Sequence, residues 1–123
     1  MTNNWDKNLR IRKSRDFRWI QRRGKKWKSS DFLFLFLPSN EVSRIGLVVS
    51  KKVGNAVVRN LVKRRLREAC RKNYECLKNN VDIVIIAFSS AAISSQNSVE
   101  HQVVKAFYGI SKKSVTIRKI RDY

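Results

Sequence analysis

Residues 32–37 are Phe-Leu-Phe-Leu-Phe-Leu, and the turn residues Pro38, Ser39 and Asn40 follow at once. A short, continuous apolar run that ends in turn residues is typical of a strand covered on both faces. We therefore expect a buried strand over residues 32–37.

A helical pattern precedes this run. Ser14 is placed to cap a helix over residues 15–23, with Asp16 in the first turn and Gly24 as its stop. Residues 1–13 are polar and basic without periodicity, so we expect them to form a basic N-terminal arm that is partly ordered at best. The length of 123 residues predicts one domain, which we place at residues 14–123.

Two more strands and two more helices are predicted after the run. Residues 45–49 and 81–87 are apolar segments typical of strands, and a helical pattern lies between them from about Ala56 to Leu77. Ser98 can cap a last helix, with Gly109 near its end. The expected order is helix, strand, strand, helix, strand, helix.

The chain is strongly basic. Lysine and arginine together count 28 against 9 acidic residues, which gives a formal net charge of +19. Such an excess repels itself unless a polyanion binds, so it indicates nucleic acid or an anionic membrane as the partner. The longest apolar run is much shorter than the roughly 20 residues of a spanning helix, and nucleic acid is therefore favoured.

Neither a secretory signal nor a disulfide is expected. The N-terminus has no apolar stretch after basic residues, which favours a cytoplasmic location. Cys70 and Cys76 would lie about 9 Å apart along one helix and on different faces, beyond the reach of a disulfide. We expect both to be thiols.

The helix predicted between the last two strands has a divided surface. Residues spaced about 100° apart place an apolar stripe toward the core, formed by Val62, Leu66, Ala69, Cys70 and Leu77. An adjacent arc is polar or cationic, and this basic arc consists of Asn60, Lys63, Arg64, Arg67 and Arg71. Glu68 and Glu75 fall on a third arc, so we expect the basic arc to lack neutralising acids. A solvated face would show similar residues, but their uncompensated repulsion favours phosphate binding.

The loop before this helix is suited to an anion. It consists of Ser50-Lys51-Lys52-Val53-Gly54-Asn55-Ala56, in which Gly54 and Asn55 can adopt left-handed backbone conformations. A helix that starts after such a loop can bind phosphate through its free N–H groups and its dipole. An ordinary strand-to-helix turn is the alternative, and Lys51 and Lys52 favour phosphate.

Residues 48–68, V-V-S-K-K-V-G-N-A-V-V-R-N-L-V-K-R-R-L-R-E, resemble the signature of the bacterial ribonuclease P protein family. The resemblance extends to I-R-K-S-R-D-F at residues 11–17 and to the three strand segments, and so covers nearly the whole chain. It implies an α+β fold, a single-domain α/β sandwich with a left-handed β-α-β crossover. Physical rules alone predict a right-handed crossover, which holds in about 98% of cases.

The resemblance implies that the chain is the protein subunit of ribonuclease P. Such a subunit binds a catalytic RNA and the 5′ leader of precursor transfer RNA, and assists magnesium-dependent endonucleolytic removal of that leader. The RNA performs the catalysis, and Mg²⁺ is expected to be held mainly by the RNA subunit and the substrate. No catalytic residue, protein metal ligand, membrane contact or obligate protein partner is expected.

The resemblance also implies site residues. The residues expected to bind RNA are Lys51, Lys52, Asn55, Arg59, Asn60, Lys63, Arg64, Arg67 and Arg71. A cleft between the first helix and the sheet is expected to hold the single-stranded leader at Phe17, Gln21 and Leu35. Gln21 and Leu35 stand where relatives commonly have aromatic residues, and Phe88 stands where a basic residue is frequent.

Two other functions fit part of the sequence. An independent metal-dependent nuclease needs carboxylates that hold ions about 4 Å apart, but the nearest acids here are seven residues apart. His101 is the only histidine, so a histidine pair is not available within one chain. A ribosomal or other structural RNA-binding protein would share the size and charge, and the extended signature is what distinguishes the two hypotheses.

Overall fold

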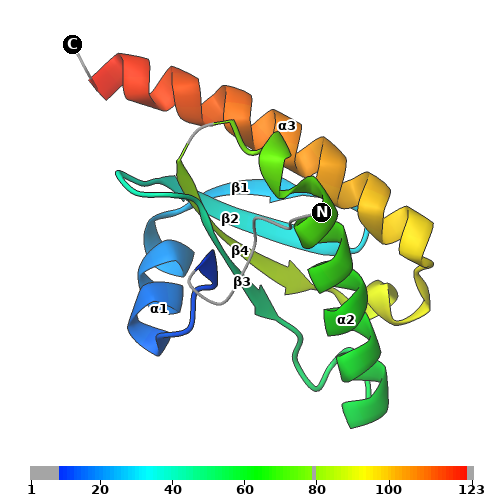
Figure 1. Ribbon diagram of the computed structural model, residues 1–123. Coiled ribbons are helices and arrows are strands. Elements are labelled where there is room, and N and C mark those ends of the chain that lie inside the picture. Colours follow the sequence, from blue (N-terminus) through cyan, green and yellow to red (C-terminus); the bar gives the residue numbers. More distant parts are fainter. Residues whose placement is uncertain (1–8, 79, 122–123) are drawn as a thin grey trace.

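The computed structural model describes residues 9–78 and 80–121, with side chains up to residue 113. Four strands form one sheet in the order β1-β2-β4-β3, and they are β1 (Lys25–Lys28), β2 (Phe32–Pro38), β3 (Arg44–Val48) and β4 (Val81–Ala87). Helix α1 (Ser14–Arg23) covers one face, whereas α2 (Ala56–Asn73) and α3 (Gln96–Arg121) cover the other (Figure 1). The predicted α+β sandwich is confirmed.

Strand β2 is covered on both faces, as its apolar run predicts. Phe32, Phe34 and Phe36 are fully buried in the core between the sheet and the α2–α3 layer. Leu35 points the other way and is buried with Ile20 of α1 in a second, smaller cluster. Because alternate side chains of one strand belong to two cores, the strand has no polar position.

The β3–α2–β4 segment is a parallel β-α-β crossover. Strand β4 pairs antiparallel with β2 and parallel with β3. The apolar stripe of α2 faces the core as predicted, with Val62, Leu66, Ala69 and Cys70 all buried. Leu77 lies beyond α2, after the short 3-10 helix η2 (Tyr74–Cys76), and is partly buried against the same core.

Strand β1 is an element that the sequence pattern does not predict. It consists of Lys25, Lys26, Trp27 and Lys28 and pairs antiparallel with β2, with Trp27 opposite Phe34. Three of its four residues are lysines and its only apolar side chain is Trp27, so the segment lacks the apolar pattern that predicts a strand. Antiparallel pairing with the buried β2 stabilises this segment as a strand, although its local sequence does not favour one.

The start of α1 differs from the prediction. Ser14 is the first helical residue rather than the cap, since the capping position is Lys13 and no side chain bonds to the free N–H groups there. Gly24 does end the helix, and its N–H donates to the carbonyl of Ile20 (2.7 Å). Its φ of −71° is an ordinary value, so this stop does not use a left-handed glycine.

The boundaries of α3 were also predicted incorrectly. The helix begins at Gln96, and the hydroxyl of Ser95 accepts the N–H of Ser98 (3.1 Å), so Ser98 lies inside the first turn. The preceding serine-rich loop contains the short 3-10 helix η3 (Ser89–Ile93). Gly109 lies within α3, where an added Cβ would be 2.1 Å from the ring of Trp27. This glycine is required by close packing and not by helix termination.

The end of the predicted N-terminal arm lies against the sheet. Arg10 forms a parallel bridge with Ile45, and the N–H of Ile11 donates to the carbonyl of Ile45 (3.0 Å). The Ile11 side chain is buried beside α1. Residues 1–8 of the arm lie outside the described residues.

The two cysteines form no disulfide, as expected, although Cys76 lies in η2 and not on the same helix as Cys70. Cys70 and Cys76 are free thiols, and burial raises the pKa of Cys70, which keeps that thiol protonated. Within the described residues, none of the helices has the length and apolar character needed to cross a membrane.

Candidate nucleic-acid interface

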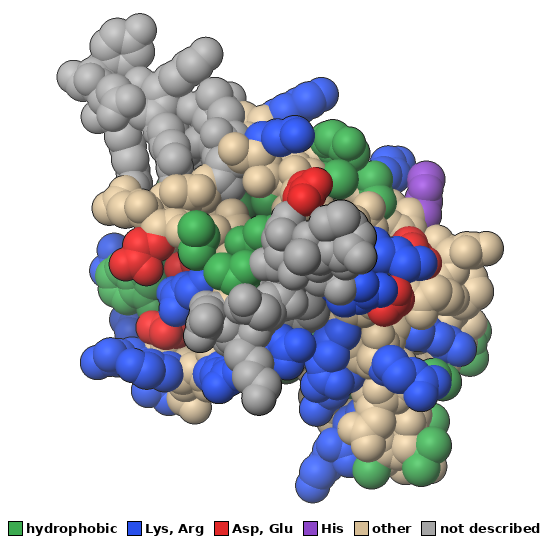
Figure 2. Space-filling view, in the orientation of Figure 1, with side chains coloured by type: hydrophobic (Ala, Val, Ile, Leu, Met, Phe, Trp, Pro, Cys, Tyr) green, Lys and Arg blue, Asp and Glu red, His purple; other side chains and the backbone are tan. Residues whose placement is uncertain are grey.

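The basic arc of α2 faces away from the core, as its helical spacing predicts. Asn60, Arg64 and Arg67 are exposed, and Lys63 is half-buried. Across the face of the molecule shown in Figure 2, Lys and Arg side chains gather over α1 and α2, with few acidic groups among them. This distribution produces a positive surface suited to a polyanion.

Arg71 is an exception to the predicted lack of acids. Its guanidinium donates two hydrogen bonds to Glu68, three residues earlier, and Lys72 lies 3.8 Å from the same carboxylate. The hydrogen bond from Arg71 lowers the pKa of Glu68, so the carboxylate stays ionised. The prediction of an unneutralised arc is therefore wrong at this end, because an i,i+3 pair forms across the boundary between two arcs.

In the loop before α2, Gly54 has a positive φ of 159°, as predicted, but Asn55 does not. Asn55 has an extended backbone (φ −71°, ψ 179°), and its side-chain carbonyl accepts the N–H of Val58 (3.0 Å). Asn55 is thus the N-cap of α2, and its side-chain carbonyl is already used inside the protein. Lys51 and Lys52 are exposed on the turn just before it.

Arg59 and Arg65 of α2 donate hydrogen bonds to backbone carbonyls of the protein. The Nε of Arg59, one of the predicted RNA-binding residues, donates to the carbonyl of Gly54 (3.2 Å) and ties the helix to its preceding loop. Arg65 donates to the carbonyl of Ser94 (2.6 Å) at the end of η3. These contacts distinguish anchoring arginines from the exposed arginines of the basic arc.

A hollow of about 260 Å³ lies between α1, β3 and α2, and we call it the α1–α2 hollow. Phe17 of α1 and Lys63 and Arg67 of α2 contribute to its lining. The remaining lining residues come from the N-terminal segment and β3, and they are Arg10, Ile11, Arg12, Ile45, Gly46 and Leu47. An aromatic ring and four cationic side chains therefore surround one hollow.

A second hollow, of about 500 Å³, lies on the exposed side of α2. It is lined by Val57, Asn60, Leu61, Arg64 and Arg67. Arg67 lines this hollow and the α1–α2 hollow as well. The basic arc and the predicted leader-binding aromatic are therefore neighbours, an arrangement that sequence spacing did not reveal.

The position of Phe17 depends on Gly46. An added Cβ at Gly46 would lie 2.7 Å from the Phe17 ring and 3.1 Å from Ile11, so the ring rests directly on the β3 backbone. The same end of α1 is held by Arg44, which donates to Asp82 (3.1 and 2.9 Å) and to Asp16 (3.4 Å). The hydrogen bond to Asp82 raises the pKa of Arg44, with burial opposing it.

The other two predicted leader contacts lie in different environments. Gln21 is exposed on α1. Leu35 is buried in the cluster between α1 and the sheet, with only 4% of its surface exposed. The Leu35 side chain packs between the sheet and α1. An RNA strand therefore cannot contact Leu35 unless α1 moves away from the sheet.

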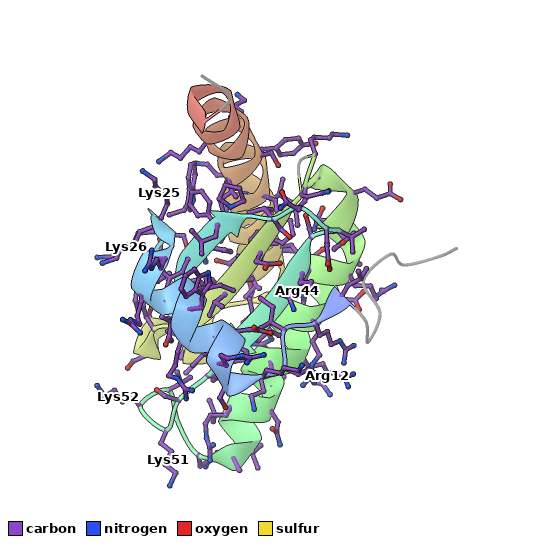
Figure 3. The ribbon with its side chains drawn as sticks, turned by 90° about the vertical axis from the view of Figure 1, so that its left-hand side faces the viewer. Arg12, Lys25, Lys26, Arg44, Lys51 and Lys52 are labelled. Atoms are coloured by element: carbon purple, nitrogen blue, oxygen red, sulfur yellow. The ribbon has the colours of Figure 1, made fainter. Side chains whose placement is uncertain are left out.

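Sequence reasoning missed several cations that belong to this surface. Arg10 and Arg12 were assigned to the arm, yet they line the α1–α2 hollow. Viewed from the α1 side, Arg12 and Arg44 lie near β3, Lys51 and Lys52 lie at the loop before α2, and Lys25 and Lys26 lie at the opposite edge (Figure 3). The alternation of Arg10, Ile11 and Arg12 is the signal that could have revealed a strand-like segment.

The donor set for a metal ion is sparse. Among the described residues, no group of three or more His, Cys, Asp or Glu side chains could hold a metal ion. The chemistry that the surface offers is electrostatic binding and stacking.

The fold and the basic surface define a small α+β RNA-binding protein. A family model described as Ribonuclease P matches residues 5–111. The chain is 42% identical to the ribonuclease P protein component of Clostridium novyi over 100 residues, covering 79% of this chain and 88% of the relative. It is 39% identical to that of Exiguobacterium sibiricum over 113 residues, covering 89% and 97%.

Solved structures agree with these sequence comparisons. The ribonuclease P protein of Staphylococcus aureus superposes with a TM-score of 0.73 at 30% identity and covers 85% of this chain and 95% of that one. The Thermotoga maritima ribonuclease P protein gives a TM-score of 0.74 at 31% identity and covers 80% and 94%. The chain belongs to the ribonuclease P protein family, whose general role is in transfer RNA processing.

Proposed function

We propose that this chain is the protein subunit of a cytoplasmic ribonuclease P. It binds the catalytic RNA subunit and the 5′ leader of precursor transfer RNA, and assists removal of that leader by the RNA. The observation that carries the proposal is Arg67, which lines both the α1–α2 hollow beside Phe17 and the hollow on the exposed side of α2. One basic surface can therefore contact two RNA segments at the same time.

The two hollows have different chemistry. Beside Phe17, the α1–α2 hollow offers an aromatic ring for a base and cationic groups for the phosphates on either side of it, which is how proteins hold single strands. The exposed side of α2 offers Asn60, Arg64 and Arg67 to the phosphates of a folded RNA. We assign the leader to the first hollow and the RNA subunit to the second.

Mg²⁺ supplies activation of the attacking water and charge neutralisation, and we place it mainly with the RNA subunit and the substrate. The contribution of this chain is to neutralise phosphate repulsion between two RNAs and to fix the leader strand.

Reconstitution tests the proposal. Precursor transfer RNA is incubated with this protein alone, with a bacterial ribonuclease P RNA alone, and with both at low Mg²⁺ concentration. We expect efficient cleavage at the mature 5′ end only with both components. Cleavage by the protein alone would contradict the assignment of catalysis to the RNA. Binding without stimulation would indicate a structural RNA-binding protein instead.

A substitution in the shared arginine sharpens this test. Arg67→Gln should weaken stimulation, because it removes one cation from both hollows. Lys78→Gln removes the same charge from an exposed position outside both hollows, and it should leave stimulation unchanged.

A further inference from the structure

A third hollow lies at the β1 edge of the sheet. It has a volume of about 340 Å³ and lies between the β1–β2 turn and α3, so we call it the β1–α3 hollow. Its lining includes an indole, two lysines, a histidine and two serine hydroxyls, from Trp27, Lys28, Lys105, His101, Ser29 and Ser30. No acidic side chain of the described residues lines it.

Hydrogen bonds fix the walls of this hollow. The hydroxyl of Ser29 donates to the side-chain carbonyl of Gln102 (2.6 Å), and the N–H of Asp31 donates to the same oxygen (2.9 Å). These bonds tie the β1–β2 turn to α3 across more than 70 residues of sequence. A preorganised wall lowers the entropic cost of binding a ligand.

The aromatic wall is fixed as well. The ring of Trp27 rests on Gly109, where an added Cβ would be 2.1 Å away, and the Lys113 ammonium lies 5.5 Å from its centroid. Lys28 lies 5.8 Å from the centroid of Phe88, at the end of β4. Rings and cations therefore alternate along this edge, and single-stranded nucleic acids bind to surfaces of this composition.

This edge is separate from the surface assigned above. Strands β1 and β3 are the two edges of the sheet, so three inter-strand spacings, about 14 Å, separate them. Lys25 and Lys26 at the β1 edge lie on the opposite side of the view from Arg12 and Arg44 (Figure 3). The β1–α3 hollow therefore shares no lining residue with the α1–α2 hollow or with the hollow on the exposed side of α2.

Basic residues continue along the sequence of α3 beyond the family match. The family match ends at residue 111, whereas α3 continues to Arg121. The sequence of residues 112–121 contains no acid and five basic residues, namely Lys112, Lys113, Arg118, Lys119 and Arg121.

We propose that the β1–α3 hollow is a second RNA-binding site, which takes an unpaired RNA segment. Lys28 and Lys105 bind its phosphates, and Trp27 provides the apolar wall for a base. The proposal rests on the proposed function, since it requires an RNA partner large enough to reach both edges of the sheet. Lysines on an edge strand also prevent strand pairing between molecules, but Lys105 and His101 come from α3 and have no such role.

The test is a double substitution with a charge-matched control. Lys28→Gln/Lys105→Gln removes two exposed cations from the hollow. Lys72→Gln/Lys78→Gln removes the same charge from exposed positions that line none of the three hollows, and Lys72 is already paired with Glu100 (3.5 Å). Equal unfolding midpoints of the two variants in urea verify that both are folded.

Dissociation constants are measured against salt concentration for the ribonuclease P RNA alone and for precursor transfer RNA alone. For two lost single-strand phosphate contacts, we expect the logarithmic salt slope to fall by about 1.4 units, with affinity about tenfold lower at physiological salt. The control should keep the wild-type slope. The RNA for which the slope falls is the source of the bound segment.

The remaining outcomes separate the two proposals. If the wild-type protein binds both RNAs and the double variant matches the control with each, the β1–α3 site is excluded while the proposed function stands. If the wild-type protein binds neither RNA, the proposed function is contradicted, and the β1–α3 site, which depends on it, is contradicted as well. Chemical footprinting adds a direct measure, because nucleotides at the β1–α3 site should lose protection in the double variant only.

Discussion

At the scale of single residues, Gly46 decides where the Phe17 ring in the lining of the α1–α2 hollow lies. The ring of Phe17 occupies the space that a side chain at this strand position would need. The Arg44 contacts to Asp82 and Asp16 then hold α1 in register with the sheet. A residue without a side chain is thus part of the candidate site, although it can make no side-chain contact with RNA.

Gly46→Ala should therefore destabilise the protein by about 1–3 kcal/mol, since overpacking forces the Phe17 ring or the β3 backbone to move. Urea unfolding of this variant, of Phe17→Ala and of the double variant measures the coupling. The cost of Gly46→Ala should be smaller when Phe17 is already alanine. Additive costs would show that the two residues do not compete for this space.

Asp31 gives a residue-scale prediction about pH. Burial acts to raise its pKa, but hydrogen bonds from Ser94, Ser90 and Gln102 outweigh burial and lower the pKa below its usual value. A carboxylate with a lowered folded-state pKa contributes stability above its unfolded pKa of about 3.9, and this stability is lost as the pH falls through the folded value.

The free energy of unfolding of the wild type should hence fall more steeply on acidification below about pH 4 than that of Asp31→Asn. Urea titrations at a series of pH values measure both. Glu41→Gln, at an exposed position, is the control and should follow the wild type. Parallel curves for wild type and Asp31→Asn would contradict the role given to the Asp31 hydrogen bonds.

At the scale of elements, apolar runs predicted strands well and polar residues predicted helix ends poorly. The three apolar segments became β2, β3 and β4 because each needed burial that only a covered sheet supplies. Strand β1 was missed because its order comes from pairing with β2, and Gly109 was misassigned because its reason is the ring of Trp27. Local patterns carry information about burial along one segment but not about contacts between segments.

For Asn55, the sequence alone does not distinguish capping of α2 from contact with RNA. It belongs to the family signature and was predicted to bind RNA, yet its side chain caps α2. Asn55→Ala should cost about 1 kcal/mol of stability, and Asn55→Ser, which keeps a capping oxygen, should cost much less. Thermal unfolding gives the stabilities, and RNA affinity measured in parallel distinguishes the roles. Full affinity in the serine variant supports capping, whereas equal losses in both variants support a direct RNA contact.

At the scale of the whole molecule, the sequence predicted which helix carries the basic arc but not what lies beside it. Helical spacing alone placed Asn60, Arg64 and Arg67 on an exposed face. The approach of Phe17 to Arg67 depends on α1 packing across the sheet, which residues 50 apart in sequence cannot reveal. Sequence spacing does not predict the β1–α3 hollow either, because its lining residues, 27–30 and 101–105, are far apart in the sequence.

Glu68 provides the final prediction, because it is the acid that neutralises the end of the basic arc. With a net charge of +19, the protein gains affinity for RNA by releasing counterions, and a cation held by Glu68 contributes less to that release. Glu68→Gln frees Arg71, so RNA affinity should rise and the logarithmic salt slope should steepen by roughly 0.7–0.9 units for one new phosphate contact. Glu41→Gln adds the same charge on an exposed turn and should leave the slope unchanged, while Glu68→Gln/Arg71→Gln should return it to the wild-type value. A slope that steepens equally in Glu68→Gln and Glu41→Gln would show that net charge alone, and not the position of Arg71 on α2, controls the affinity.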